Sequence, residues 1–316
     1  MDSLIYSLNA TMPVFLIMVI GCALRRTGML SDGFVKSADK FNFKVTLPFM
    51  LFSDLASTDI RQTFDLKYAL LCAGITVVMF SALWAVSRLI IKDKSMVGAF
   101  VQAGCRSSVA VLGLAFIMNI YGDTGMAPVM IIGCVPLYNV FSVVILTFEA
   151  DGNSGSTAEH IKKSLIGIVK NPIIISIFLG VLAALISLRL PPIIEKTIKS
   201  VGTLASPLTL ITIGAAFEGR KAVKKLKPTV AASFIKLVVL PAVFLPIAVK
   251  MGYRDQALTA LIIMLGSPTT PSAYIMAKNM NNDHVLTSSV IVTTTLFSAL
   301  TLTFWIFVAR YFGYTI

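Results

Sequence analysis

The chain has 316 residues, of which 56% are apolar and only 13% charged, and its formal net charge is +12. Soluble globular domains carry about 25% charged residues, so most of this chain must be solvated by lipid. The mean hydropathy of +0.85 comes from apolar runs of about twenty residues, the length that crosses about 30 Å of hydrocarbon. The Lys and Arg residues lie in short segments between these runs and form no continuous basic face, which argues against a nucleic-acid-binding protein.

Cysteine spacing gives no sign of a metal centre, a cofactor or a disulfide framework. The four cysteines all fall inside apolar runs without metal-ligand spacing, and they are Cys22, Cys72, Cys105 and Cys134. Small apolar packing is the role that this pattern favours. The first apolar run follows Asp2 and ends in two arginines instead of a small-residue cleavage site, so we interpret it as a first membrane span.

The apolar windows predict an all-α integral membrane protein of about ten transmembrane helices. The expected spans are residues 4–25, 34–55, 68–91, 97–121, 126–149, 164–187, 196–218, 228–250, 257–279 and 285–310. The one extended polar stretch begins at residue 150 and ends at 163, close to the midpoint, as expected of a cytoplasmic linker. It divides the chain into a first half, residues 1–149, and a second half, residues 164–316.

The distribution of basic residues predicts the orientation. Segments after odd-numbered spans hold about twice as many Lys and Arg residues as those after even-numbered spans, so they should be cytoplasmic. Both termini are then outside, in a multi-pass protein of the cell (inner or plasma) membrane. Five spans in each half would make the halves inverted with respect to each other. This count of basic residues leaves Arg106 and Lys236 unassigned within spans.

An internal repeat supports this 5+5 division. Three pairs of residues match at one offset of 159 residues, namely Pro13 with Pro172, Gly21 with Gly180 and Pro48 with Pro207. The segments FSVVILTF (residues 141–148) and FSALTLTF (residues 297–304) also share one pattern in the fifth and tenth spans. Inverted repeats of this kind are common among secondary transporters.

The fourth and ninth spans, which are equivalent in the two halves, each carry a polar break. In the ninth, Ser267 and Pro268 follow Gly266 and interrupt the helix, Thr270 is the expected N-cap and Pro271 suits the first position of a new half-helix.

In the fourth span Gly104 is the weak point, and Ser107 or Ser108 is expected to cap the second half. Broken backbone at mid-membrane is tolerated only where it is buried in protein or lines a cavity. The N-termini of half-helices favour an anion, and the alternative is that both breaks only kink buried helices.

Three polar side chains lie close to these breaks. Arg106 is about nine residues, or roughly 14 Å, inside its span, so it requires a partner: a substrate carboxylate, or a permanent ion pair with Asp54 or Glu218. Lys236 either balances the crossing electrostatically or donates to carbonyls freed by Pro241.

Asn139, in the fifth span, either contacts a carboxylate or bridges two helices.

The chain resembles the auxin efflux carrier family, which includes plant PIN-type carriers and bacterial malate permeases. The resemblance lies in LPFMLFSDLAS (residues 47–57), PLYN (136–139), KLVVLP (236–241) and SPTTPSAYIMAK (267–278), together with the two broken spans.

The resemblance implies a homodimer in which spans 1, 2, 6 and 7 form a scaffold. Spans 3–5 and 8–10 would form a transport domain that moves like an elevator, with substrate at the crossing of the broken helices. Family members have a proline in both breaks, whereas the fourth span here has none, which favours a compact, more highly charged anion over indole-acetate. Asn139 matches a polar position of the fifth span in these carriers.

These observations predict a secondary active transporter of small organic anions, such as malate or auxin-like acids, and not an enzyme. The expected substrate-binding residues are Gly104, Arg106, Ser107, Ser108, Asn139, Ser267, Pro268, Thr269, Thr270 and Pro271, with an electrostatic or coupling role for Lys236 and Asp54. An anion channel or a membrane sensor is the alternative. An intramembrane enzyme would require paired acids or a His/Asp set at mid-span, which the sequence does not offer.

Overall fold

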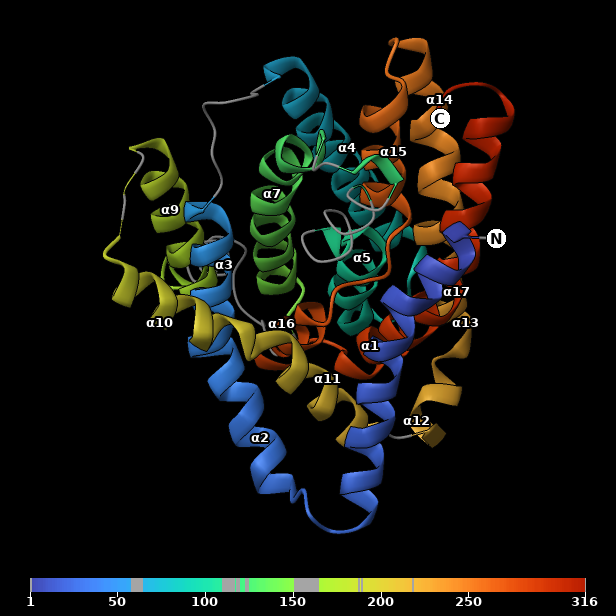
Figure 1. Ribbon diagram of the computed structural model, residues 1–316. Helices are drawn as coiled ribbons and strands as arrows, with labels where there is room; N and C mark the ends of the chain where they lie inside the picture. The colour runs from blue at the N-terminus through green and yellow to red at the C-terminus, as the bar shows by residue number, and fades with distance from the viewer. Residues whose placement is uncertain are drawn as a thin grey trace.

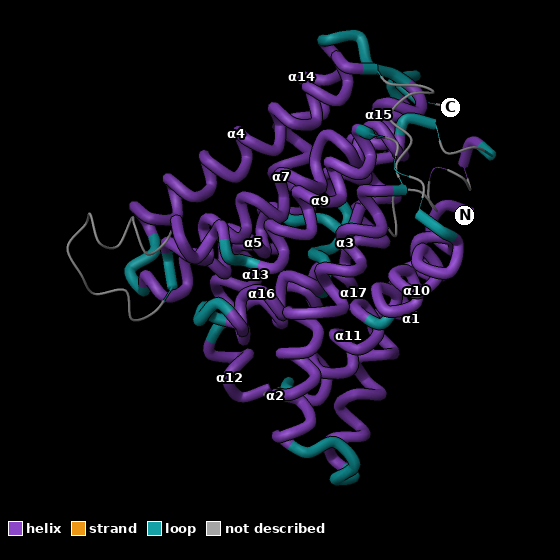
Figure 2. The backbone as a smooth tube through the Cα atoms, turned by 90° about the vertical axis from the view of Figure 1, so that its left-hand side faces the viewer, coloured by secondary structure: helices purple, strands orange, loops and turns teal. Residues whose placement is uncertain are grey.

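The computed structural model describes residues 2–57, 65–109, 117, 120–122, 125–150, 165–186, 188, 190–217 and 219–315. Within these ranges every regular element is a helix, as the tube in Figure 2 shows. The first half contains α1 (Asp2–Arg26), α2 (Asp32–Phe41), the π-helical turn η1 (Asn42–Thr46), α3 (Leu47–Ala56), α4 (Leu66–Ile90), the 3-10 turn η2 (Lys94–Met96), α5 (Val97–Cys105) and α7 (Ala127–Phe148).

The second half contains α9 (Pro172–Leu185), α10 (Pro192–Thr203), α11 (Ala205–Ala215), α12 (Gly219–Lys224), α13 (Leu226–Phe234), the π-helical turn η4 (Ile235–Val239), α14 (Leu240–Lys250), α15 (Asp255–Gly266), α16 (Ser272–Asn279) and α17 (His284–Tyr311). Helix therefore occurs in all ten predicted spans, although much of 110–121 and the linker at 151–163 lie outside the described residues.

Five helical segments in the described part of the chain are long and apolar enough to cross a membrane. They are Leu66–Ile90, Ala127–Phe148, Pro192–Ala215, Leu226–Lys250 and His284–Tyr311. Two shorter apolar helices, α9 and α15, accompany them. The all-α membrane fold expected from composition is confirmed, whereas the number of ten crossings stays a prediction.

Buried apolar side chains form two large clusters, which divide the helices into two groups. The first cluster comes entirely from α4, α5, α7, η4, α14, α15, α17 and the short segments joined to them; together with α13 and α16 we call these helices the central group. The second cluster joins α1, η1, α3, α9 and α11; with α2 and α10 these form the flanking group. Figure 1 shows α3, α9 and α10 on the left of the molecule, away from α14, α15 and α17 on the right.

Helix α16 packs where the two groups meet. Its residues Tyr274, Ile275, Met276 and Ala277 belong to the second cluster, although the chain enters α16 directly from α15 of the central group. Parts of α7 and α17 contribute to the same cluster through Val143 and Ile291. One face of the central group is therefore apolar and covered by the flanking group.

Inside the flanking group, two glycines allow helices to approach closely. A β-carbon on Gly21 of α1 would clash with the carbonyl oxygen of Ile211 in α11. A β-carbon on Gly180 of α9 would lie too close to the carbonyl oxygen of Phe52 in α3. The two contacts are related by the sequence offset of 159, because adding 159 to 21 and to 52 gives 180 and 211. The two contacts are therefore spaced by the offset of the expected repeat, and the repeat itself stays a prediction.

Ion pairs hold the ends of the central group together. Arg88 Nε lies 3.0 Å from Oε1 of the buried Glu149, which joins α4 to α7. Lys225 Nζ lies 2.9 Å from Asp283 and 3.6 Å from Asp93, which joins α13 to α17 and to η2. The hydrogen bond from the Ser95 hydroxyl lowers the pKa of Asp93, so that this carboxyl stays charged beside the lysine.

We expect that Gly21→Ala and Gly180→Ala will each destabilise the protein by about 1–3 kcal/mol, because an added methyl group forces packed backbones apart. Thermal unfolding of the purified protein in detergent measures this. Gly74→Ala is the matched control: it also lies in a helix, but a β-carbon there meets no atom within 4 Å, so the change should be neutral or slightly stabilising. Equal stability of all three variants would contradict the close packing.

Candidate functional site

Both of the expected helix breaks are present. Helix α5 ends at Cys105, where Arg106 turns into extended backbone with φ −72° and ψ 132°. Helix α15 ends at Gly266, and Ser267 after it is also extended, with φ −66° and ψ 154°. The chain resumes helical structure at Ser272 of α16 after the second break. After the first break helical backbone reappears at Val109. Residues 110–116 lie outside the described residues, so capping of this half-helix by Ser107 or Ser108 stays a prediction.

The two breaks cross and bond directly to each other. The backbone N–H of Ser108 donates to the carbonyl oxygen of Pro268 at 3.0 Å. The Thr269 hydroxyl donates to the Ala103 carbonyl at 2.7 Å, and the Ser107 hydroxyl to the Met264 carbonyl at 2.5 Å. Three polar groups near one break are therefore bonded to groups near the other, as expected of broken helices that are buried in protein inside a membrane.

Arg106 lies at this crossing with 4% of its surface exposed. One terminal nitrogen donates to Asn139 Oδ1 at 2.6 Å and to Ser272 Oγ at 3.0 Å. The other approaches Ser142 Oγ at 3.3 Å and the sulfur of Met276 at 3.0 Å. All four partners are neutral, and they come from α7 and α16.

The ion pairs in the described part of the chain do not include Arg106, so the expected alternative of a permanent salt bridge finds no support there. Asp54, one of the two acids considered, instead lines a cavity of about 370 Å³ with Glu195 and Lys199 of α10. Glu218, the other, lies outside the described residues. Among the described residues, Arg106 is thus a buried cation whose charge is solvated only by neutral dipoles, an arrangement that favours an anionic ligand.

Lys236 is completely buried and lies between the ends of the two broken helices. Its ammonium donates to the carbonyl oxygens of Cys105 at 3.2 Å and Leu265 at 2.9 Å, and also to the Ser107 hydroxyl. These carbonyls belong to the C-terminal ends of α5 and α15, where the helix dipole favours a cation.

The alternative that Lys236 donates hydrogen bonds to carbonyls freed by Pro241 is wrong. Proline removes the donor that would normally reach the carbonyl four residues earlier, which here is that of Leu237. This carbonyl accepts a hydrogen bond from Trp305 Nε1 at 3.0 Å instead. Lys236 therefore lies at the crossing, and its electrostatic role stays a prediction.

Asn139 is held in one orientation by its own helix. Its side-chain Nδ2 donates to the Val135 carbonyl at 2.9 Å, so Oδ1 faces Arg106. Asn139 has no exposed surface. The residue therefore bridges α7 to the crossing and positions the guanidinium.

The start of α16 offers backbone N–H groups. Those of Thr270 and Ser272 donate to none of the groups that the structure describes, whereas that of Thr269 donates to Thr294 Oγ1 at 3.1 Å. The expectation that Thr270 caps the helix is wrong. Its hydroxyl contacts Ser272 Oγ at 3.2 Å, and Pro271 occupies the cap position without a side-chain cap bond. The amides are left free because the proline turn replaces a polar cap.

The remaining predicted residues occupy different parts of the site. Ser267 and Pro268 are buried at the break, whereas Ser108 and Thr270 are half-buried and mark its more accessible side. A β-carbon on Gly104 would point at Leu83 of α4 and Ala232 of α13, so this glycine serves helix packing and faces away from the polar groups around Arg106.

Three side chains around Arg106 were not among the predicted site residues, namely Ser142, Ser272 and Met276. Ser142 could have been found, because it lies three residues after Asn139 and therefore on the same face of a helix. Ser272 and Met276 share a face of α16 in the same way. Without the crossing geometry, no pattern in the sequence directs them toward Arg106.

Comparison with known proteins identifies the type of protein. Residues 6–306 match the family described as "Membrane transport protein". The chain belongs to this family of transport proteins. The resemblance to auxin efflux carriers noted from the sequence is thereby confirmed. A relative from Rhizobium meliloti (strain 1021), named "Putative malonate transporter", is 23% identical to this transport protein over 271 residues, which cover 84% of each chain.

Lys236→Met in this transport protein should lower the free energy of unfolding by about 2 kcal/mol or more, because two buried carbonyl groups lose their donor and each costs about 1–3 kcal/mol. Lys250→Met is the control, since Lys250 is an exposed lysine at the end of the same span. Thermal unfolding in detergent compares the two variants. A Lys236→Met protein as stable as Lys250→Met would show that the ammonium does not hold the two helix ends.

Proposed function

We propose that this membrane transport protein is a secondary active carrier of small organic anions, and of compact dicarboxylates in particular. The observation that carries the proposal is Arg106, a buried cation held only by neutral groups beside the free N–H groups of Thr270 and Ser272. A carboxylate can accept two parallel hydrogen bonds from a guanidinium. Helix N–H groups can hold its remaining oxygens.

The balance of buried charge favours a dianion. Four charged side chains in the described part of the chain are buried: Asp39, Arg106, Glu149 and Lys236. The two acids have basic partners, Lys278 for Asp39 and Arg88 for Glu149. Arg106 and Lys236, both at the crossing, have none among the described residues, so the site carries two positive charges to be balanced.

The name of the Rhizobium meliloti relative is consistent with such a substrate, since malonate is a compact dicarboxylate. The fourth span also lacks the proline that auxin carriers have in their first break. Both features favour malonate- or malate-like anions over a bulky monocarboxylate.

The proposed mechanism is alternating access of the elevator type. The flanking group would be the scaffold and the central group the transport domain, and the separation of the two apolar clusters supports this division. The related glycine contacts, Gly21 with Ile211 and Gly180 with Phe52, support two inverted halves of five spans each. The distribution of basic residues supports a cell-membrane protein with both termini outside, and the family resemblance supports a homodimer.

Uptake of labelled malonate into proteoliposomes tests this function. A carrier should show saturable uptake that is stimulated by unlabelled malonate preloaded inside, whereas a channel or sensor should show no such stimulation. Arg106→Gln should weaken malonate binding about 10- to 100-fold, the equivalent of a charge-assisted hydrogen bond. Arg106→Lys should retain part of the activity, because its point charge cannot reproduce the planar fork.

The control for Arg106→Gln is Lys250→Gln, which removes a positive charge at an exposed position. Stability should not fall strongly in Arg106→Gln, because its neutral partners leave no buried acid unpaired. Measuring malonate affinity and melting temperature on the same samples separates the two roles. Unchanged affinity together with lost stability would remove Arg106 from the substrate site.

One ion pair joins the proposed scaffold to the proposed transport domain in the described part of the chain. Lys278 Nζ of α16 lies 2.5 Å from Oδ2 of the buried Asp39 in α2, and 2.9 Å from the Tyr274 hydroxyl. The Asn279 side chain also donates to the Asp39 carbonyl at 3.4 Å. If α16 moves with the transport domain, these contacts must break in every cycle.

A disulfide between Asp39→Cys and Asn279→Cys should therefore abolish uptake, and a reductant should restore it. The control is a disulfide between Asn42→Cys and Thr209→Cys, two side chains that share a 3.1 Å hydrogen bond within the flanking group. This bond should leave uptake unchanged. Full transport by the protein cross-linked between positions 39 and 279 would contradict a movement of α16 past α2.

A further inference from the structure

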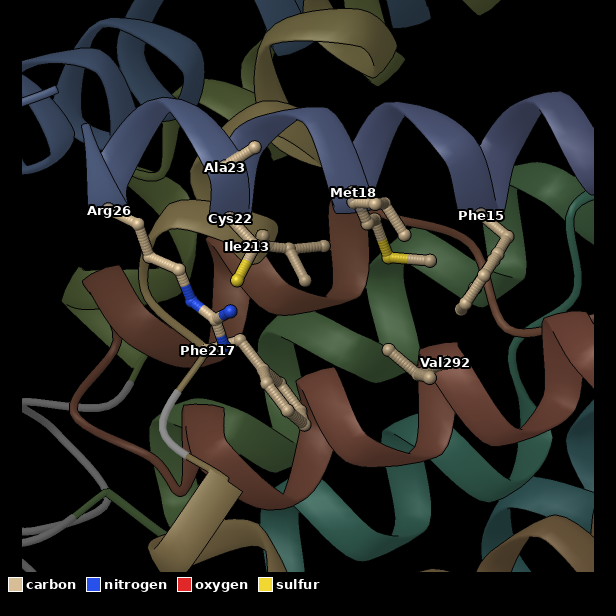
Figure 3. A pocket seen from close by; sticks show the side chains of 10 residues that line it. Phe15, Met18, Cys22, Ala23, Arg26, Ile213, Phe217 and Val292 are labelled. Atoms are coloured by element: carbon tan, nitrogen blue, oxygen red, sulfur yellow. The ribbon is translucent and has the colours of Figure 1, made fainter. Parts of the chain in front are cut away.

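A groove separate from the crossing runs along α1, at its contact with α11 and α17. It has a volume of about 390 Å³ and is lined by apolar side chains, with one cation among them. Figure 3 shows the order of its lining residues: Phe15 lies at one end, Met18 and Cys22 follow along α1, Val292 faces them from α17, and Arg26 extends toward Phe217 at the other end.

The dimensions of the groove match one leaflet of a bilayer. From Phe15 to Arg26 α1 advances eleven residues, or about 16 Å, and half of the hydrocarbon core is about 15 Å thick. The apolar end therefore lies near the depth of the bilayer centre when the arginine lies at the level of the headgroups. Leu16, Val19 and Ile20 on the same helix are about half exposed, so this side of α1 is open to lipid.

Arg26 is free to bind a ligand. In the described part of the chain it makes no ion pair and no side-chain hydrogen bond. The adjacent Arg25, by contrast, is occupied by Asp32 at 2.5 Å and by the Leu30 carbonyl at 2.7 Å. A guanidinium without a partner at the headgroup level suits a phosphate, with which it can form two parallel hydrogen bonds.

We propose that this groove is a binding site for one anionic phospholipid, whose acyl chain lies along α1 against Met18, Cys22 and Val292 and whose phosphate binds Arg26. Burial of methylene groups supplies the binding energy, and the arginine supplies selectivity for the negative headgroup. The site is independent of the proposed substrate site. It contacts both the flanking group, through α1 and α11, and the central group, through α17.

Native mass spectrometry of the full-length protein in detergent, with equal amounts of phosphatidylglycerol and phosphatidylcholine, tests the site. The wild type should retain one phosphatidylglycerol per chain in preference to phosphatidylcholine. Arg26→Gln should reduce the retained phosphatidylglycerol about tenfold, as expected for one charge-assisted contact. Lys36→Gln removes an exposed charge from α2 and should leave retention unchanged.

A second variant tests the apolar part of the groove. Val292→Phe fills the space opposite Met18 and should reduce retention of both lipids, whereas Val243→Phe, at an exposed position of α14, should not. Phosphatidylglycerol retained equally by wild type and Arg26→Gln, or undiminished retention by Val292→Phe, would overturn the proposal. Since the readout is lipid mass and not transport, failure here is distinguishable from failure of the proposed carrier function.

Discussion

The structure depends on satisfying the backbone groups that two broken helices leave unpaired inside the membrane. Each such group costs several kcal/mol in hydrocarbon. The Lys236 ammonium donates to carbonyls in the last turns of both α5 and α15, and the amide of Ser108 donates to the Pro268 carbonyl across the crossing. The two breaks therefore share these hydrogen bonds, and the other helices of the central group pack around them.

Arg106 and Lys236 are similarly buried but differ in what solvates them. The ammonium of Lys236 contacts backbone carbonyls, which cannot turn away without unfolding a helix end, so its charge is part of the framework. The guanidinium of Arg106 contacts hydroxyl, amide and thioether side chains instead of the backbone of a helix end, so a change of partner there unfolds no helix. This difference supports the proposal that the substrate binds Arg106, with Lys236 contributing its charge from a fixed position.

Local features of the sequence were sufficient to predict the helices and the breaks. The length of an apolar run and the positions of Pro, Gly and Ser determine the backbone within a few residues. Local features were insufficient to predict which groups bind the two buried cations, Arg106 and Lys236. Lys236 bonds to Cys105, 131 residues away, and such a contact depends on which helices cross. The N-cap expected at Thr270 was wrong because Pro271 already sets the first turn. Ser272 was missed because only the crossing brings it to Arg106.

The proposed inverted repeat explains the geometry of the site, and its departures from symmetry explain the chemistry. The glycine contacts of the flanking group are repeated at one offset, which would hold the two halves in equivalent frames. The breaks differ, however: Arg106 follows α5 where the uncharged Ser267 follows α15, and two prolines open the start of α16 where the fourth span has none. The guanidinium from one half therefore donates to the Ser272 hydroxyl at the start of α16 in the other half. A symmetric pair of breaks would offer two equivalent polar turns, whereas this asymmetric pair holds one cation and one set of free amide donors, the combination on which the proposed binding of an anion rests.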